Sequence, residues 1–276
     1  MSNIHKNLKY LLLFVLAISM GGCEDVVHAD LNTAAPRLVI DASIDWVKGT
    51  DGSLQKIKLT TTTGFYDAEV PIVSNAEVHI SNSSNVVFEF VENPGTGEYV
   101  CDHFVPQIAE TYKLTVITGG QTYVATEKLF AAPDIESVAQ NNDGGVSGSD
   151  IELKFFFRDN GAEDNFYLTS FQTNITIFPD YDAYDDEFFQ GNQIYGFYLN
   201  EGLKAGDQTT FSVYGVSERY MNYMSILIGI IDDGGSPWSA PPTNVRGNLV
   251  NETDSKNFAL GYFRLSEVSR MDYTVQ

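Results

Sequence analysis

The sequence predicts a mainly β fold, and two patterns carry this prediction. Short segments place apolar residues at every second position, the period of a half-buried strand, and clusters of Gly, Pro, Asn and Ser separate them. The chain of 276 residues is 43% apolar and 13% aromatic, which is enough to build a packed core. We expect an N-terminal antiparallel β-sandwich of immunoglobulin-like or transthyretin-like type, followed by a second β-rich domain with one helix.

Residues 1–22 have the pattern of a secretory signal peptide. Two lysines precede an apolar run over 10–18, which is about half of the ~20 residues that a membrane-spanning helix needs. The two glycines before Cys23 resemble the lipobox of bacterial lipoproteins, although Met20 stands where that motif has a branched aliphatic residue. We predict that Cys23 is lipidated, becomes the mature N-terminus and anchors the chain in the outer membrane.

Residues 23–36 show no periodicity and are expected to form a tether between the membrane and the first domain. Glu24 and Asp25 directly follow the lipidated position. This placement resembles the signal that exports lipoproteins to the cell surface in Bacteroidetes-type bacteria. The alternative is that the two carboxylates only solvate the tether, so the surface is the expected location and the periplasm-facing leaflet stays open.

Residues 37–133 are predicted to be the β-sandwich domain. A glycine pair, Gly119-Gly120, joins two matched alternating segments, which is typical of a two-residue hairpin loop. The domain is expected to end at Pro133. The predicted strands, in order, lie near 38–42, 57–63, 76–80, 86–90, 99–101, 112–116 and 122–126.

Residues 134–276 are predicted to be the second β-rich domain. It begins with a polar, glycine-rich segment over 141–150 that is expected to be a linker. A helix is expected near 217–229, because Ser217 suits an N-cap and apolar residues follow at three- and four-residue spacing. The strands of this domain are expected near 151–158, 166–178, 211–214 and 258–265.

The order and spacing of several short segments resemble one family over nearly the whole mature chain. The segments are Cys23-Glu-Asp-Val, Pro36-Arg-Leu-Val-Ile40, Asn75-Ala-Glu-Val, Gly97-Glu-Tyr99, Tyr112-Lys-Leu-Thr-Val116, Asp134-Ile-Glu-Ser137, Arg158-Asp159, Asn165-Phe-Tyr167, Pro241-Pro-Thr-Asn244 and Ala259-Leu-Gly-Tyr-Phe263. In this order they are similar to domain of unknown function 4249 (DUF4249). The resemblance implies a lipoprotein of a Bacteroidetes-type outer membrane, often encoded near a TonB-dependent receptor, which makes such a receptor the leading candidate partner. It implies no catalytic residues.

Charge and cysteine content exclude several classes of partner and site. With 37 acidic and 16 basic residues the net charge is −21, which disfavours nucleic acid and anionic lipid headgroups. If Cys23 carries lipid, Cys101 is the single remaining cysteine and no internal disulfide forms. Cys101 and His103 lie two apart on a predicted strand, and we favour a buried structural thiol over a zinc pair or a thiol–imidazole dyad.

The densest polar and aromatic stretch, 179–189, supplies the first candidate site. Exposed tyrosines stack on organic ligands, and carboxylates bind calcium. The alternative, which we favour, is an acidic surface loop whose phenylalanines pack back on the core. A proline-rich loop holds Trp238, which is either a further recognition residue or a cover over the end of the sandwich, and we favour the cover. The candidates are Tyr181, Tyr184 and Trp238 for a ligand, and Asp180, Asp182, Asp185 and Asp186 for calcium, the one cofactor considered.

The sequence contains no nucleophile elbow, phosphate-binding loop or zincin helix, so we expect a non-enzymatic protein. The main hypothesis is a lipid-anchored, surface-exposed binding or accessory protein that works with a TonB-dependent receptor in nutrient uptake. One alternative is an extracellular glycan hydrolase that uses carboxylates of the 180–187 loop. The other is a structural or adhesion component of the cell surface.

Overall fold

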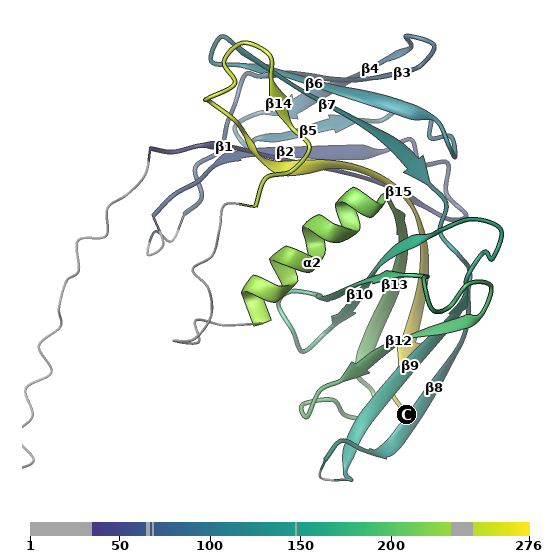
Figure 1. Cartoon of the computed structure of the whole chain (residues 1–276). Helices are drawn as coiled ribbons and strands as arrows, with labels where there is room; N and C mark the ends of the chain where they lie inside the picture. The colour runs from purple at the N-terminus through teal and green to yellow at the C-terminus, as the bar shows by residue number, and fades with distance from the viewer. Residues whose placement is uncertain (1–34, 65–66, 68, 147, 233–244) are drawn as a thin grey trace, which may run out of the picture. The chain divides into compact units, whose positions relative to one another are not determined.

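The computed structural model describes residues 35–64, 67, 69–146, 148–232 and 245–276, and within these ranges the fold is mainly β with one helix, α2 (Figure 1). No helix in the described ranges is both long enough and apolar enough to span a membrane. The elements are β1 (Leu38–Val47), β2 (Gln55–Thr61), β3 (Glu77–Asn82), β4 (Val87–Asn93), β5 (Glu98–Cys101), β6 (Thr111–Thr118), β7 (Gln121–Phe130), β8 (Ile135–Gly144), β9 (Asp150–Arg158), β10 (Phe166–Thr173), β11 (Asp180–Asp185), β12 (Gln193–Leu199), β13 (Gln208–Val216), α2 (Glu218–Asp232), β14 (Val250–Asn251) and β15 (Leu260–Thr274).

The strands of the N-terminal region join the last strand of the chain in a closed, barrel-like sheet. Hydrogen-bonded pairs run from β15 through β1, β2, β5, β4, β3, β6 and β7, and β7 pairs again with β15. The pairs from β1 to β7 are antiparallel, whereas β15 is parallel to both β1 and β7. The sheet is therefore mixed, and the C-terminal strand closes it.

The C-terminal part of β15 carries the sheet further, to β13, β10 and β11, all antiparallel (Figure 1). One face of β10 and β13 packs against the three-stranded sheet β12-β9-β8, through an aromatic core that contains Phe155, Phe171 and Phe211. The other face packs against α2, with Leu168, Tyr214 and Val216 among the buried residues. Because successive strand residues point to opposite faces, each of these strands separates two cores.

The interior of the closed sheet holds the largest core. It includes Ile40, Ala42 and Ile44 of β1 and also Phe263 and Leu265 of β15. In the parallel pair, Ala42 lies opposite Phe263 and Ile44 opposite Leu265, so both strands direct these side chains inward. The alternate residues of β1 and β15 face outward, toward α2, and this outer face builds the site described below.

Much of the predicted element order is confirmed. A predicted strand coincides with each of the first seven strands, and Gly119 and Gly120 form the hairpin turn with φ of 56° and 73°. The helix extends to Asp232, three residues past the predicted end, and the Ser217 hydroxyl accepts a hydrogen bond from the Tyr220 N–H at 3.2 Å, as an N-cap does.

Three local predictions were wrong, each where neighbouring strands override local composition. The predicted linker over 141–150 begins as part of β8, which pairs with β9 up to Gly144 across a bulge. The acidic segment 180–185 is not a loop but the edge strand β11, held by β10. The last strand does not end at 265 but continues to Thr274, because β13 supplies a pairing partner.

Candidate functional site

A cavity of about 460 Å³ lies between α2 and the outer face of the sheet. Strands β11, β10, β13, β15 and β1, which are neighbours in this order, each contribute lining side chains. This volume lies within the ~300–1,000 Å³ typical of small-molecule sites. The cavity is therefore the candidate site, and its chemistry follows from the side chains on two central strands and on the helix.

Strand β1 contributes a row of polar groups. Its apolar residues alternate with Asp41, Ser43 and Asp45, all of which line the cavity. The Ser43 hydroxyl donates to Asp41 Oδ1 at 2.9 Å. The buried Gln55 fixes the backbone of Asp45: the Asp45 N–H donates to Gln55 Oε1 at 3.1 Å, and Gln55 Nε2 donates to the Asp45 carbonyl at 2.9 Å.

Strand β15 contributes a buried cation, Arg264, which is 5% exposed. Its Nη1 donates to Asp45 Oδ1 at 2.7 Å, and the guanidinium carbon lies 5.0 Å from the Tyr214 ring centroid and 5.3 Å from that of Tyr220. Its Nε has no hydrogen-bond partner in the part of the chain that the structure describes. Burial by itself would lower the pKa of Arg264, but Asp45 and Tyr220 outweigh it and raise the pKa above its usual value. Arg264 is thus a permanent cation in the cavity wall.

Tyrosines form most of the remaining wall. Tyr220 and Tyr223 of α2 meet Tyr262 of β15, with ring centroids 4.8 and 4.9 Å from that of Tyr262. Burial raises the pKa of Tyr181 and of Tyr223 to about 12 each, and it also raises the pKa of Tyr220. These phenols are neutral at physiological pH, so they offer aromatic faces and hydroxyl donors rather than charge.

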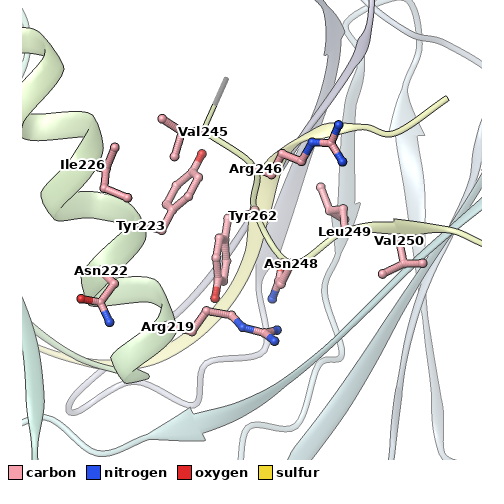
Figure 2. A pocket seen from close by; sticks show the side chains of 11 residues that line it. Arg219, Asn222, Tyr223, Ile226, Val245, Arg246, Asn248, Leu249, Val250 and Tyr262 are labelled. Carbon is pink, nitrogen blue, oxygen red and sulfur yellow. The ribbon is translucent and has the colours of Figure 1, made fainter. Parts of the chain in front are cut away.

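A second cavity, of about 470 Å³, adjoins the first and shares Tyr223 and Tyr262 with it (Figure 2). Its wall includes Arg219 of α2 and Arg246 of the segment before β14. Figure 2 shows the Tyr262 ring between α2 and that segment. Asn248 also lines this cavity, but both polar atoms of its amide bind the backbone of Phe263. Its Nδ2 donates to the Phe263 carbonyl at 2.8 Å, and its Oδ1 accepts the Phe263 N–H at 2.9 Å.

The predicted ligand residues separate in the structure. Tyr181 lines the first cavity, but Tyr184 lies three residues along the same strand and therefore on the opposite face, where it packs near the aromatic core. The Tyr184 hydroxyl donates to Asp182 Oδ2 at 3.1 Å. Trp238 and Cys23 lie outside the described residues.

The predicted calcium ligands separate for the same reason. Asp180 and Asp182 share one face of β11, and Asp185 lies on the other. Asp186 is buried, and its Oδ2 accepts the Asn165 N–H at 2.6 Å. In the part of the chain that the structure describes, no three His, Cys, Asp or Glu side chains gather as a metal ion would require.

Cys101 is buried, and burial raises the pKa of its thiol. Strand β5 ends at Cys101, so His103 does not share that strand as predicted, but it still approaches: the Cys101 Sγ lies 3.7 Å from His103 Nδ1. A thiol with a raised pKa is a poor nucleophile and a poor metal ligand at neutral pH. These observations favour the structural role.

Sequence reasoning missed most of the cavity. The every-second-residue spacing of Asp41, Ser43 and Asp45 is that of an ordinary strand face exposed to solvent. Arg264 did carry a signal, since a cation in the middle of an apolar strand requires a partner when it is buried. Tyr220 was expected only as one of the apolar positions of the helix. The contacts among these residues arise only when β1, β15 and α2 pack together, and no local pattern in the sequence predicts that packing.

The family model described as Domain of unknown function (DUF4249) matches residues 24–272. The chain belongs to this family. The DUF4249 match includes both β1 and the cavity-lining part of β15, so it covers both strands that carry the polar groups of the site. The family resemblance inferred from the sequence is confirmed.

Other comparisons add no functional information about this DUF4249 member. A comparison with curated proteins gave no match. Among solved structures, a two fibronectin type-III domain segment of chicken tenascin is 8% identical, with 65% of this chain and 90% of that chain covered and a TM-score of 0.22. A cytokine receptor complex is 10% identical (64% and 82% covered, TM-score 0.25), and the FN1–FN3 domains of chicken CNTN1 are 11% identical (66% and 62% covered, TM-score 0.23). TM-scores this low support no inference.

Proposed function

We propose that this DUF4249 chain is a non-enzymatic binding protein of the outer membrane that holds a polar organic ligand in the cavity beneath α2. In this proposal lipid on Cys23 anchors the chain at the cell surface, and a TonB-dependent receptor is its partner in nutrient uptake. The body consists of an immunoglobulin-like or transthyretin-like arrangement of the strands over 37–133, completed by β15, and of a β-rich region formed by the rest of 134–276. Calcium is not part of the proposal.

The observation that carries the proposal is the buried Arg264 in a wall of tyrosines. A guanidinium has five N–H donors, and removing it from water is costly unless acceptors replace the solvent. The protein supplies Asp45 as the ion-pair partner, and among the described residues Nε has no hydrogen-bond partner. A stable fold alone would be served as well by an apolar pair at this place, because buried ion pairs seldom add net stability. A ligand-binding role accounts for the polar groups.

The geometry of the cavity favours binding over hydrolysis. Its wall contains no His, Cys, Lys or Glu among the described residues, and its tyrosines are neutral. Asp41 accepts the Ser43 hydroxyl, and Asp45 forms an ion pair with the buried Arg264. Both carboxylates are thus occupied by the protein, whereas glycoside hydrolysis needs a pair of carboxyl groups that act on the scissile bond. Of the 180–187 segment, Tyr181 alone reaches the cavity, and none of its carboxylates does.

The anchor and the partner are tested together in cells that express the full chain. We expect wild-type protein to incorporate labelled palmitate, to enter the detergent phase of a phase separation and to copurify with a TonB-dependent receptor. The Cys23→Ala variant should lose the label and enter the aqueous phase. Wild-type protein that is unlabelled and aqueous refutes the anchor, and repeated purification without any receptor refutes the partner.

Ligand binding is tested on the purified protein by thermal shift with a library of saccharides, amino acids and small peptides. A ligand that binds only the native state raises Tm, and the rise grows with the logarithm of the ligand concentration once this exceeds Kd. We expect at least one class to stabilise the wild type and to lose this effect in Tyr223→Ala, which removes one cavity wall. Phe197→Ala is the matched control, because this exposed aromatic lies on β12 and lines neither cavity. No stabilisation by any class refutes the binding role.

A further inference from the structure

The second cavity has a charge opposite to that of the whole protein. The chain has 37 acidic and 16 basic residues, yet the described wall of this cavity contains two arginines, Arg219 and Arg246, and no carboxylate. Both arginines are exposed, and neither forms an ion pair within the described part of the chain. A cationic hollow in a strongly anionic protein concentrates anions locally.

Packing holds Arg246 in place. Its guanidinium carbon lies 3.7 Å from the ring centroid of Phe258, and the guanidinium of Arg37 lies 3.9 Å from the same ring. The stacked geometry leaves the N–H donors at the edge of the planar group available to an acceptor. Phe258 itself does not line the cavity, and Figure 2 shows the Arg246 guanidinium on the side of its segment that faces away from α2, so the stacking orders this side chain beside the cavity.

Arg219 stands in the first turn of α2, and it interacts electrostatically with Glu127. This carboxylate does not line the cavity. It accepts hydrogen bonds from the Ser217 and Tyr262 hydroxyls, at 3.0 and 3.4 Å. Burial raises the pKa of Glu127, and its oxygens are occupied by these two hydroxyls and by the Lys128 N–H at 3.1 Å. Arg219 therefore retains its capacity to bind an anion.

The two cavities meet at Tyr223 and Tyr262, which belong to both walls. Tyrosine rings of this kind stack on the C–H faces of sugar rings, and Asp41, Ser43 and Asp45 in the first cavity accept or donate hydrogen bonds to hydroxyl groups. Guanidinium groups in the second cavity match carboxylate or sulfate geometry. One side of the shared tyrosines is suited to a polyhydroxyl ring, and the other to an anionic group.

We propose that the two cavities form one site for an acidic saccharide, with its anionic group against the wall that carries Arg219 and Arg246 and a neighbouring sugar ring beneath α2. This inference rests on the proposed binding function and specifies its ligand class. The anionic group is either a carboxylate, as in a uronic acid, or a sulfate ester, because both offer two neighbouring anionic oxygens that can accept parallel N–H bonds from a guanidinium.

The test is calorimetric titration of the full chain with three matched disaccharides: a uronate-bearing one, a sulfated one and their neutral counterpart. We expect one of the acidic probes to bind at least about tenfold more tightly than the neutral probe, since a hydrogen bond to a charged group is worth about that factor. Added salt should reduce this preference, because the arginines are exposed. The stronger acidic probe identifies the carboxylate or the sulfate.

The variants are Arg219→Gln and Arg246→Gln, with Arg270→Gln as the matched control. Arg270 is an exposed arginine on β15 that lines neither cavity. Each of the first two changes should weaken binding of the acidic probe about tenfold and leave the neutral probe unaffected. The control should change neither. Equal Tm values for all four proteins show that the losses do not come from unfolding.

The outcomes separate the two proposals. Binding of the neutral probe with equal affinity, or acidic binding that survives both arginine changes, overturns the acidic-saccharide inference and leaves the binding function intact. If none of the three probes binds, the inference also fails, whereas the thermal-shift library still decides the binding function on ligands of other classes.

Discussion

Replacing Asp45 by Asn should destabilise the protein by leaving Arg264 buried without its counter-ion. The Arg264 side chain is 6% exposed and the Asp45 side chain 34% exposed. Removal of one partner from a fully buried pair costs about 3–5 kcal/mol. Because water reaches Asp45, part of the interaction is already screened, and we expect a smaller loss of about 2 kcal/mol.

The double variant Asp45→Asn, Arg264→Met identifies the cause. Met has a similar length, is apolar, and packs against the rings of Tyr214 and Tyr220 that now contact the guanidinium. If the unpaired cation is what destabilises Asp45→Asn, its removal should restore stability to within about 1 kcal/mol of the wild type.

Both variants are measured by urea unfolding, followed by circular dichroism, at a fixed pH and ionic strength. A loss of 2 kcal/mol lowers the ratio of folded to unfolded protein by about thirtyfold. The reasoning is refuted if Asp45→Asn unfolds at the wild-type urea concentration, or if the double variant is no more stable than the single one.

Three further predictions concern stability and reactivity. Gly261→Ala should lower the free energy of unfolding in urea by about 2–4 kcal/mol, because its Cβ would lie 2.0 Å from the Ile40 carbonyl oxygen at a φ of +92°. Gly206→Ala is the control: its φ is +96° but its surroundings are open, so it should cost only backbone strain. Equal losses in the two variants would contradict this. Burial raises the pKa of Glu127, so ionisation of this carboxyl destabilises the native state as pH rises through the raised pKa. Glu127→Gln should therefore be more stable than the wild type at neutral pH and equally stable in acid. Urea unfolding at both pH values tests this, and a stability advantage of the variant that grows on acidification would rule it out. Because the thiol pKa of Cys101 is raised, its alkylation should be slower by more than about tenfold in native than in unfolded protein, measured by peptide mass, and equal rates would show an accessible thiolate.

Local patterns predicted the strands well, because alternation is a property of a few adjacent residues. Ile40, Ala42 and Ile44 indicate one buried face of β1 regardless of what packs there. The hairpin at Gly119-Gly120 follows from a requirement for positive φ that glycine meets at low cost. The helix start follows from the hydroxyl of Ser217. In each case the cause lies within a turn or two of the residue.

The cavity depends on distant pairing, and local patterns do not report it. Asp45 and Arg264 are separated by 219 positions and meet because β1 and β15 run side by side. Tyr181 and Tyr184 looked equivalent in an acidic loop, and only the pairing of β11 with β10 places them on opposite faces. An edge strand rich in Asp has poor intrinsic strand propensity, so its apolar neighbour decides its conformation.

Because β15 closes the sheet, the N-terminal core is completed only at the end of synthesis. Ile40 and Ile44 are made early in synthesis, but the parallel partner that covers them, which includes Phe263 and Leu265, leaves the ribosome last. Until then the first strands expose an unpaired edge to chaperones and to other nascent chains. A truncation of only a few dozen residues at the C-terminus therefore removes β15, the strand that completes the N-terminal core.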